Sequence, residues 1–72
     1  MKKAYEEAIK ELELASKQAP DDARYAYVLG VALYDSGQHQ QGLRVLRQAL
    51  ARHPNDTDLI NAVAAYTRSP PN

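Results

Sequence analysis

The sequence predicts an all-α fold made of four antiparallel helices. In four separate stretches, apolar residues recur at spacings of three and four, and no stretch alternates apolar and polar residues as a half-buried strand would. Proline or glycine lies between these stretches, which divides them into short helices. The sequence also aligns with itself at an offset of 34 residues, which predicts that the helices repeat in pairs.

The first two helices are expected at residues 3–18 and 22–35. Pro20 ends the first helix. Its apolar stripe consists of Tyr5, Ala8, Ile9, Leu12 and Ala15. Asp22 is the expected N-cap of the second helix, and Gly37 supplies the left-handed residue that stops it. The inward stripe of the second helix consists of Ala26, Leu29, Gly30 and Leu33.

The other two helices are expected at residues 39–52 and 57–68, with Pro54 between them and a proline-rich tail at 69–72. The third helix is expected to turn inward Gly42, Leu43, Leu46, Ala49 and Leu50. The fourth is expected to turn inward Ile60, Val63 and Ala64.

Composition excludes several classes of partner. The 72 residues make one small domain or a fragment of a larger one. Nine basic side chains balance nine acidic ones, so no net charge attracts nucleic acid or an acidic membrane surface. The sequence has no cysteine, so neither a disulfide nor a thiolate metal site is expected. No signal-peptide core and no run of transmembrane length is present, which makes the cytoplasm the default compartment.

The titratable residues suggest no enzyme. His39 and His53 lie about 20 Å apart along one predicted helix, which is too far for the two to share a metal ion. His39 follows Asp35 by four residues, and we expect the two to form a local ion pair. No serine has a matching histidine and carboxylate motif for nucleophilic catalysis, so neither a catalytic residue nor a cofactor is predicted.

The 34-residue offset places small residues on small ones and large residues on large ones. The pairs before the second helix are Tyr5 with His39, Ala8 with Gly42, Ile9 with Leu43, Leu12 with Leu46, Ala15 with Ala49 and Pro20 with Pro54. The pairs after it begins are Ala26 with Ile60, Leu29 with Val63 and Gly30 with Ala64. A period of this length in helix pairs indicates a solenoid.

These residues resemble the tetratricopeptide repeat family. The positions that meet the family's pattern are Leu29, Gly30, Leu33, Gly37, Gly42, Leu46, Ala49 and Pro54. The resemblance makes residues 23–56 a complete repeat, residues 3–22 the second helix of a preceding repeat, and residues 57–68 the first helix of a following one. It implies a right-handed helical solenoid fragment. Ala26, His39 and Gly42 depart from the pattern, since the family usually has a large aromatic residue, tyrosine and alanine there.

The resemblance also implies a concave groove that holds extended peptides or partner segments. Its expected lining consists of Arg24, Tyr27, Val31, Tyr34, Asn61, Ala65 and Arg68. Tyr27 and Tyr34 are suitable anchors because tyrosine offers a large contact area with few rotatable bonds. Alternatively, both tyrosines only pack against neighbouring helices. Val31 and Asp58 stand where some members carry the asparagine and lysine that clamp a C-terminal carboxylate, so we expect no such clamp.

Two classes of function therefore remain. The first is a protein interaction module that binds a protein or peptide in the groove. The second is a structural, engineered or truncated repeat unit that binds no ligand and self-associates as a homodimer or helix-exchanged oligomer. This second class rests on exposed apolar surface that is expected around Ile60, Val63 and Tyr66. All lysines and glutamates lie within residues 2–17 and all arginines and aspartates from 21 onward, which suggests a grafted first helix or chance bias.

Gly30 is the residue that helix propensity explains least, because an interior glycine costs about 0.5–1 kcal/mol relative to alanine. We interpret it as the closest crossing of two antiparallel helices, where a side chain would hold the backbones apart. Gly42 and Ala8 are expected to play the related part on the other helices.

Overall fold

The computed structural model describes the backbone of residues 2–68 and the side chains of residues 6–68. These residues form no strand, and their helices are α1 (Lys2–Gln18), α2 (Ala23–Asp35), α3 (His39–Arg52) and α4 (Thr57–Arg68). The predicted all-α fold is therefore confirmed. The side chain of Tyr5 and the tail at 69–72 lie outside the described residues.

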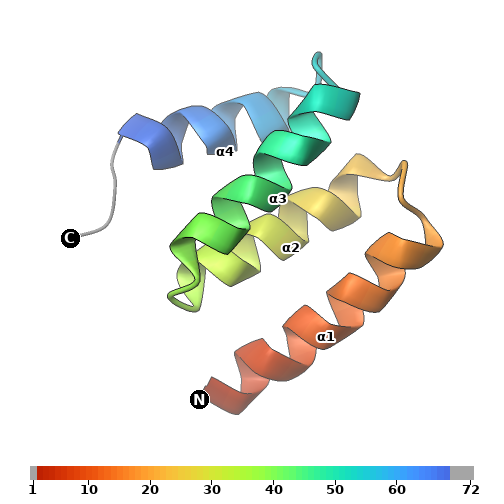
Figure 1. The fold of residues 1–72 in the computed structure, drawn as a ribbon, viewed down its shortest axis with the longest axis vertical. Coiled ribbons are helices and arrows are strands. Elements are labelled where there is room, and N and C mark those ends of the chain that lie inside the picture. Colours follow the sequence, from red (N-terminus) through yellow and green to blue (C-terminus); the bar gives the residue numbers. More distant parts are fainter. Residues whose placement is uncertain (1, 69–72) are drawn as a thin grey trace.

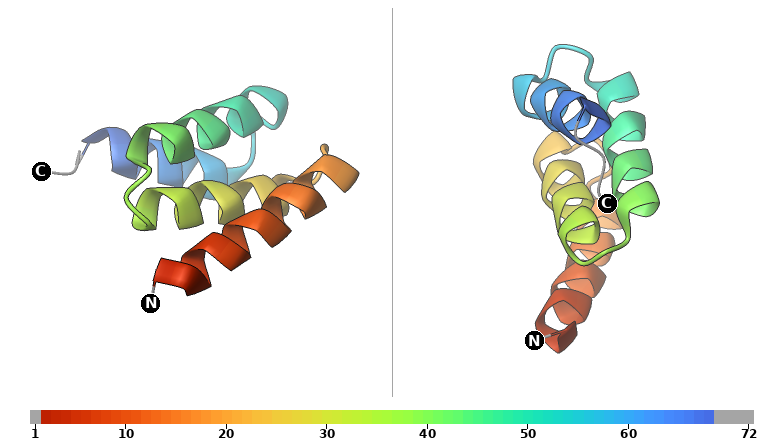
Figure 2. Two further views of the ribbon diagram at one scale, coloured as in Figure 1. Left: turned by 60° about the horizontal axis from the view of Figure 1, so that its bottom comes forward. Right: turned by 90° about the vertical axis from the view of Figure 1, so that its left-hand side faces the viewer.

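Helix α2 lies at the centre of the fold. α1 packs along one side of α2 and α3 along the other, while α4 packs on α3 and also reaches α2 (Figure 1, Figure 2). The arrangement is a slab with extents of 34 × 33 × 14 Å. Each helix is therefore buried only by its immediate neighbours, as in a solenoid.

The ends of α2 follow from its flanking residues. Asp22 precedes the helix, rather than beginning it, and its carboxylate accepts a hydrogen bond from the backbone N–H of Arg24 at 3.0 Å. Gly37 has a φ of 101°, which glycine adopts without a steric penalty. Its N–H donates to the carbonyl of Tyr34 at 3.2 Å, and the next N–H, from Gln38, donates to Leu33 at 2.9 Å, so α2 ends in a closed turn.

The buried residues of the core form two clusters. The first joins α1 to α2 and consists of Ile9, Leu29 and Leu33. The second joins α3 to α4 and consists of Leu46, Ala49 and Leu59. Leu46 and Leu59 are both 0% exposed, so burial of these side chains contributes about 1.5–3 kcal/mol each.

The predicted inward face of α4 was wrong by part of a turn. Leu59 is the fully buried residue, whereas Ile60 is 40% exposed and Ala64 is also exposed. Val63 and Tyr66 are half-buried, so of the exposed apolar surface predicted around Ile60, Val63 and Tyr66 only Ile60 is exposed. The reason is that α4 packs on α3 and α2 alone, and no helix of the described chain covers its Ile60 side. Ala8 on α1 is exposed for the same reason, so it takes no part in a close crossing within the chain.

The closest approach of two helices lies where Gly30 of α2 meets Gly42 of α3. A Cβ atom added to Gly42 would lie 2.5 Å from the carbonyl oxygen of Gly30 and 2.7 Å from the backbone nitrogen of Tyr34. A Cβ atom on Gly30 would lie 2.5 Å from Cγ of the fully buried Leu46. Both glycines are thus explained by contact between α2 and α3, as the sequence predicted for this pair.

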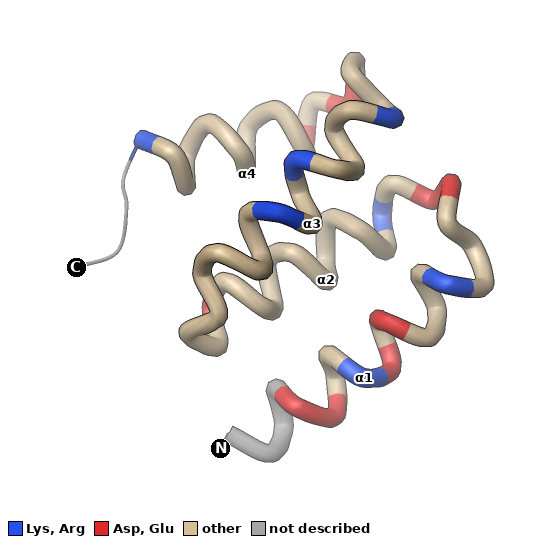
Figure 3. Tube along the Cα trace, in the orientation of Figure 1, with Lys and Arg blue, Asp and Glu red and all other residues tan. Residues whose placement is uncertain are grey.

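The helices of residues 2–68 differ in charge. Figure 3 shows that α1 carries both acidic and basic residues, whereas the charged residues of α3 are all basic. Among the described residues, no helix combines the length and the apolar character that a membrane span requires.

Replacing Gly30 by leucine should unfold the domain, because the buried Leu46 cannot move aside. The matched control is Ala64→Leu, which changes the equivalent repeat position on α4, where the residue is exposed. We expect Ala64→Leu to keep the helical circular dichroism spectrum and Gly30→Leu to lose it. A fully helical and stable Gly30→Leu variant would show that the assigned crossing is wrong.

Candidate functional site

The predicted groove residues lie on two helices that contact each other, α2 and α4. We call them the α2/α4 surface, which consists of Arg24, Tyr27, Val31, Tyr34, Asn61, Ala65 and Arg68. Asn61, Ala65 and Arg68 are exposed, and Val31 is half-buried. The side chain of Arg24 is 89% exposed and forms a 3.4 Å ion pair with Asp22. The surface thus offers exposed polar groups beside partly covered apolar ones.

The two tyrosines of α2 are both half-buried, and both contact other helices. The ring of Tyr34 stacks on Tyr66 of α4, with centroids 3.7 Å apart and planes 5° apart, and His39 meets it edge-on at 4.7 Å. Tyr27 packs against the cluster of Leu46, Ala49 and Leu59. Both rings therefore pack between helices, while part of each remains accessible.

Tyr66 is a member of this arrangement that the groove prediction missed. The residue 34 positions earlier is Ala32, so the internal repeat gave no indication of an aromatic contact there. Tyr66 lies three residues after Val63 and four after Ala62. This helical spacing is the signal that could have placed Tyr66 on the packed face of α4.

The expected ion pair between Asp35 and His39 is wrong. The ion pairs among the described side chains join Arg24 to Asp22 and Arg52 to Asp21. His39 instead packs edge-on against Tyr34 across the turn that joins α2 to α3, a favourable geometry for two aromatic rings. No group of three or more histidine, cysteine, aspartate or glutamate residues within the described part of the chain could hold a metal ion.

Three side chains on or beside the α2/α4 surface have a pKa that differs from its usual value. Hydrogen bonds from Arg24, first from its side chain and then from its backbone, hold the pKa of Asp22 below its usual value. The same contact raises the pKa of Arg24. Burial raises the pKa of Tyr66, and the negative charge of Asp35 adds to the effect.

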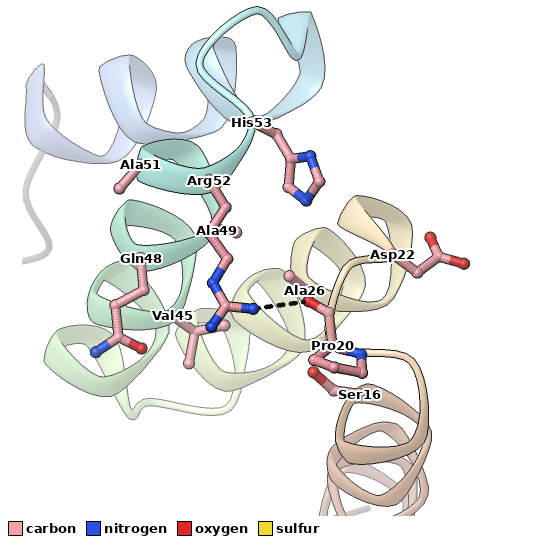
Figure 4. Close-up of a pocket in the computed structure, with 10 residues that line it drawn as sticks. All are labelled: Ser16, Pro20, Asp22, Ala26, Val45, Gln48, Ala49, Ala51, Arg52 and His53. Atoms are coloured by element: carbon pink, nitrogen blue, oxygen red, sulfur yellow. Dashed lines mark hydrogen bonds between the residues drawn. The ribbon is translucent and has the colours of Figure 1, made fainter.

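A second candidate site, which the sequence did not predict, is an open hollow of about 540 Å³ between α1 and α3 (Figure 4). It is lined by Ser16, Pro20, Asp22, Ala26, Val45, Gln48, Ala49, Ala51, Arg52 and His53. A guanidinium nitrogen of Arg52 donates to the carbonyl of Pro20 at 3.4 Å and lies 3.6 Å from the carboxylate of Asp21. Arg52 therefore spans the hollow and already has partners there.

Both apolar and polar side chains line this hollow, and three of them are the small residues Ala26, Ala49 and Ala51. Nε2 of His53 is buried with no hydrogen-bond partner among the described residues. The sequence could not predict the hollow, because its lining comes from segments that are far apart in the chain.

Most of the chain matches the model of a known protein family. The tetratricopeptide repeat model matches residues 24–66, which is more than half of the chain and extends from α2 into α4. No curated protein and no solved structure matches the chain.

The stability of the fold should fall above about pH 10 in a way that depends on Tyr66. Because the pKa of Tyr66 is raised in the folded state, the folded state holds this proton more tightly than the unfolded state does. This stabilisation is present at lower pH and is lost as the pH rises through the raised pKa. Denaturant unfolding at about pH 9 and about pH 11 measures the loss, and Tyr66→Phe should show a smaller one. Tyr25→Phe, at an exposed tyrosine, is the control and should lose as much stability as the wild type.

Proposed function

The chain belongs to the tetratricopeptide repeat family, and from this membership we propose that it binds an extended peptide or partner segment across the α2/α4 surface. Repeats of this family generally mediate interactions between proteins. They are typically scaffolds rather than enzymes, and the proposed binding accordingly needs no cofactor.

The observation that carries the proposal is the mixture of side chains on the α2/α4 surface. Val31 and the accessible parts of Tyr27 and Tyr34 provide apolar contact area. Asn61 offers both a donor and an acceptor to the main chain of a bound segment, and Arg68 offers donors only. Aromatic anchors beside polar side chains are typical of binding surfaces.

Packing between α2 and α4 supports this use of the tyrosines. The stack of Tyr34 on Tyr66 holds both rings in place before any partner arrives. A side chain that is already immobile loses little conformational entropy on binding. Packing against the neighbouring helix and contact with a partner are therefore compatible roles for these residues.

Ala65→Arg provides the direct test, because Ala65 is exposed and a long charged side chain there would block the surface. A displayed library of random peptides of about ten residues, each able to span about 30 Å when extended, supplies the ligands. We expect the selected peptides to bind Ala65→Arg about tenfold more weakly or worse, with unchanged helicity. The control, Gln40→Arg, adds an arginine at an exposed position of α3 outside both candidate sites and should keep the wild-type affinity. Equal binding by Ala65→Arg, or a library that yields no binder, would contradict the proposal.

Acidic C-terminal peptides should not be among the ligands. The carboxylate of Asp58 is exposed at the start of α4 and would repel a C-terminal carboxylate, and Val31 cannot donate a hydrogen bond to one. Pull-down with an immobilised peptide that ends in several acidic residues should capture no more protein than the amidated form does. Tight, carboxylate-dependent capture would overturn this expectation.

A further inference from the structure

Helix α4 has a second apolar side that the described chain leaves open. Leu59 faces α3 and is fully buried, whereas Ile60 and Ala64 are exposed and Val63 is half-buried. The residues 34 positions earlier on α2 are Ala26, Leu29 and Gly30, and α3 covers this side of α2. Of these, Leu29 and Gly30 are buried and Ala26 is half-buried. On α2, therefore, α3 covers the side that corresponds to the open side of α4.

Helix α1 presents the face that would match it. Its residues Ala8, Leu12 and Ala15 occupy the positions of Gly42, Leu46 and Ala49 on α3. On α3 these three residues are buried, while on α1 Ala8 is exposed and the other two are half-buried. α1 uses Ile9 and Leu12 to pack on α2, and its Ala8 side stays open.

We propose that α1 of a second copy of this chain packs on α4, in the place that α3 occupies on α2. The contact joins the two open sides, with Ala8 of one copy opposite Ala64 of the other. It is heterologous, because one copy contributes α1 and the other contributes α4, so each added copy leaves a free end for the next. The proposal does not depend on peptide binding at the α2/α4 surface.

The small residues at the crossing support this register. Gly30 and Gly42 bring the backbones of α2 and α3 into direct contact. Alanine at both equivalent positions, Ala8 and Ala64, still permits a close crossing, with the axes moved apart by the width of the two methyl groups. A larger side chain at either position would separate the helices.

The described charges also suit an antiparallel contact. Asp58 lies in the first turn of α4 and Arg68 in its last turn, while α1 carries Glu7 in its first half and Lys17 in its last turn. When α1 of one copy runs antiparallel to α4 of another, Lys17 approaches Asp58 and Glu7 approaches Arg68. Exposed pairs of this kind add little affinity, but they favour one direction of packing over the other.

Sedimentation velocity at protein concentrations between about 10 µM and about 1 mM tests the contact. This concentration range suits the weak association that a small interface gives. For the wild type we expect an average mass that rises with concentration beyond that of a dimer. Ala8→Arg and Ala64→Arg should each stay monomeric and folded, since both positions are exposed in the single chain. Gln40→Arg, at an exposed position on α3 outside the contact, should associate as the wild type does.

Mixing the two monomeric variants gives the decisive result. Ala8→Arg keeps an intact α4 side and Ala64→Arg keeps an intact α1 side, so together they should form a 1:1 dimer and nothing larger. A wild type that stays monomeric at about 1 mM would overturn the proposal. Association of Ala8→Arg with itself would also overturn it, because that requires a symmetric contact through α4 instead.

Discussion

The contact between α2 and α3 at Gly30 and Gly42 is the constraint on which the other helix positions depend. Each glycine costs about 0.5–1 kcal/mol in helix propensity, whereas full burial of Leu46 over this crossing contributes about 1.5–3 kcal/mol. The gain from packing is therefore comparable to or larger than the loss. Leu46 lies directly against Gly30 and also belongs to the cluster that joins α3 to α4.

The same residue pattern occurs in two environments, and the difference between them explains why Ala8 on α1 and Ile60 and Ala64 on α4 are exposed. Leu29 is buried because α1 and α3 both pack on α2, while its counterpart Val63 is only half-buried. Gly42 is buried, while its counterpart Ala8 is exposed. The solenoid arrangement thus leaves one apolar side open at each end of the described helices, and these sides have matching residues.

Aromatic packing gives the proposed binding surface its order. Tyr34 lies between Tyr66 and His39, so its ring joins α2, the start of α3 and the end of α4. The same contact determines what remains available to a partner, because only part of each tyrosine is accessible. A surface built in this way combines immobile rings with exposed polar side chains such as Asn61 and Arg68.

The sequence by itself determined the four helices, their ends and their repeat. These features are local, so they can be predicted from residues that are close in the sequence. They are the apolar stripes of the helices, the Asp22 cap and the positive φ of Gly37. The crossing at Gly30 was also predictable, because an interior glycine needs a packing reason. By contrast, the choice of Leu59 over Ile60 as the buried residue of α4 depends on which neighbouring helices are present. The stack of Tyr34 on Tyr66 and the hollow beside Arg52 likewise depend on distances between helices, which only the tertiary structure decides.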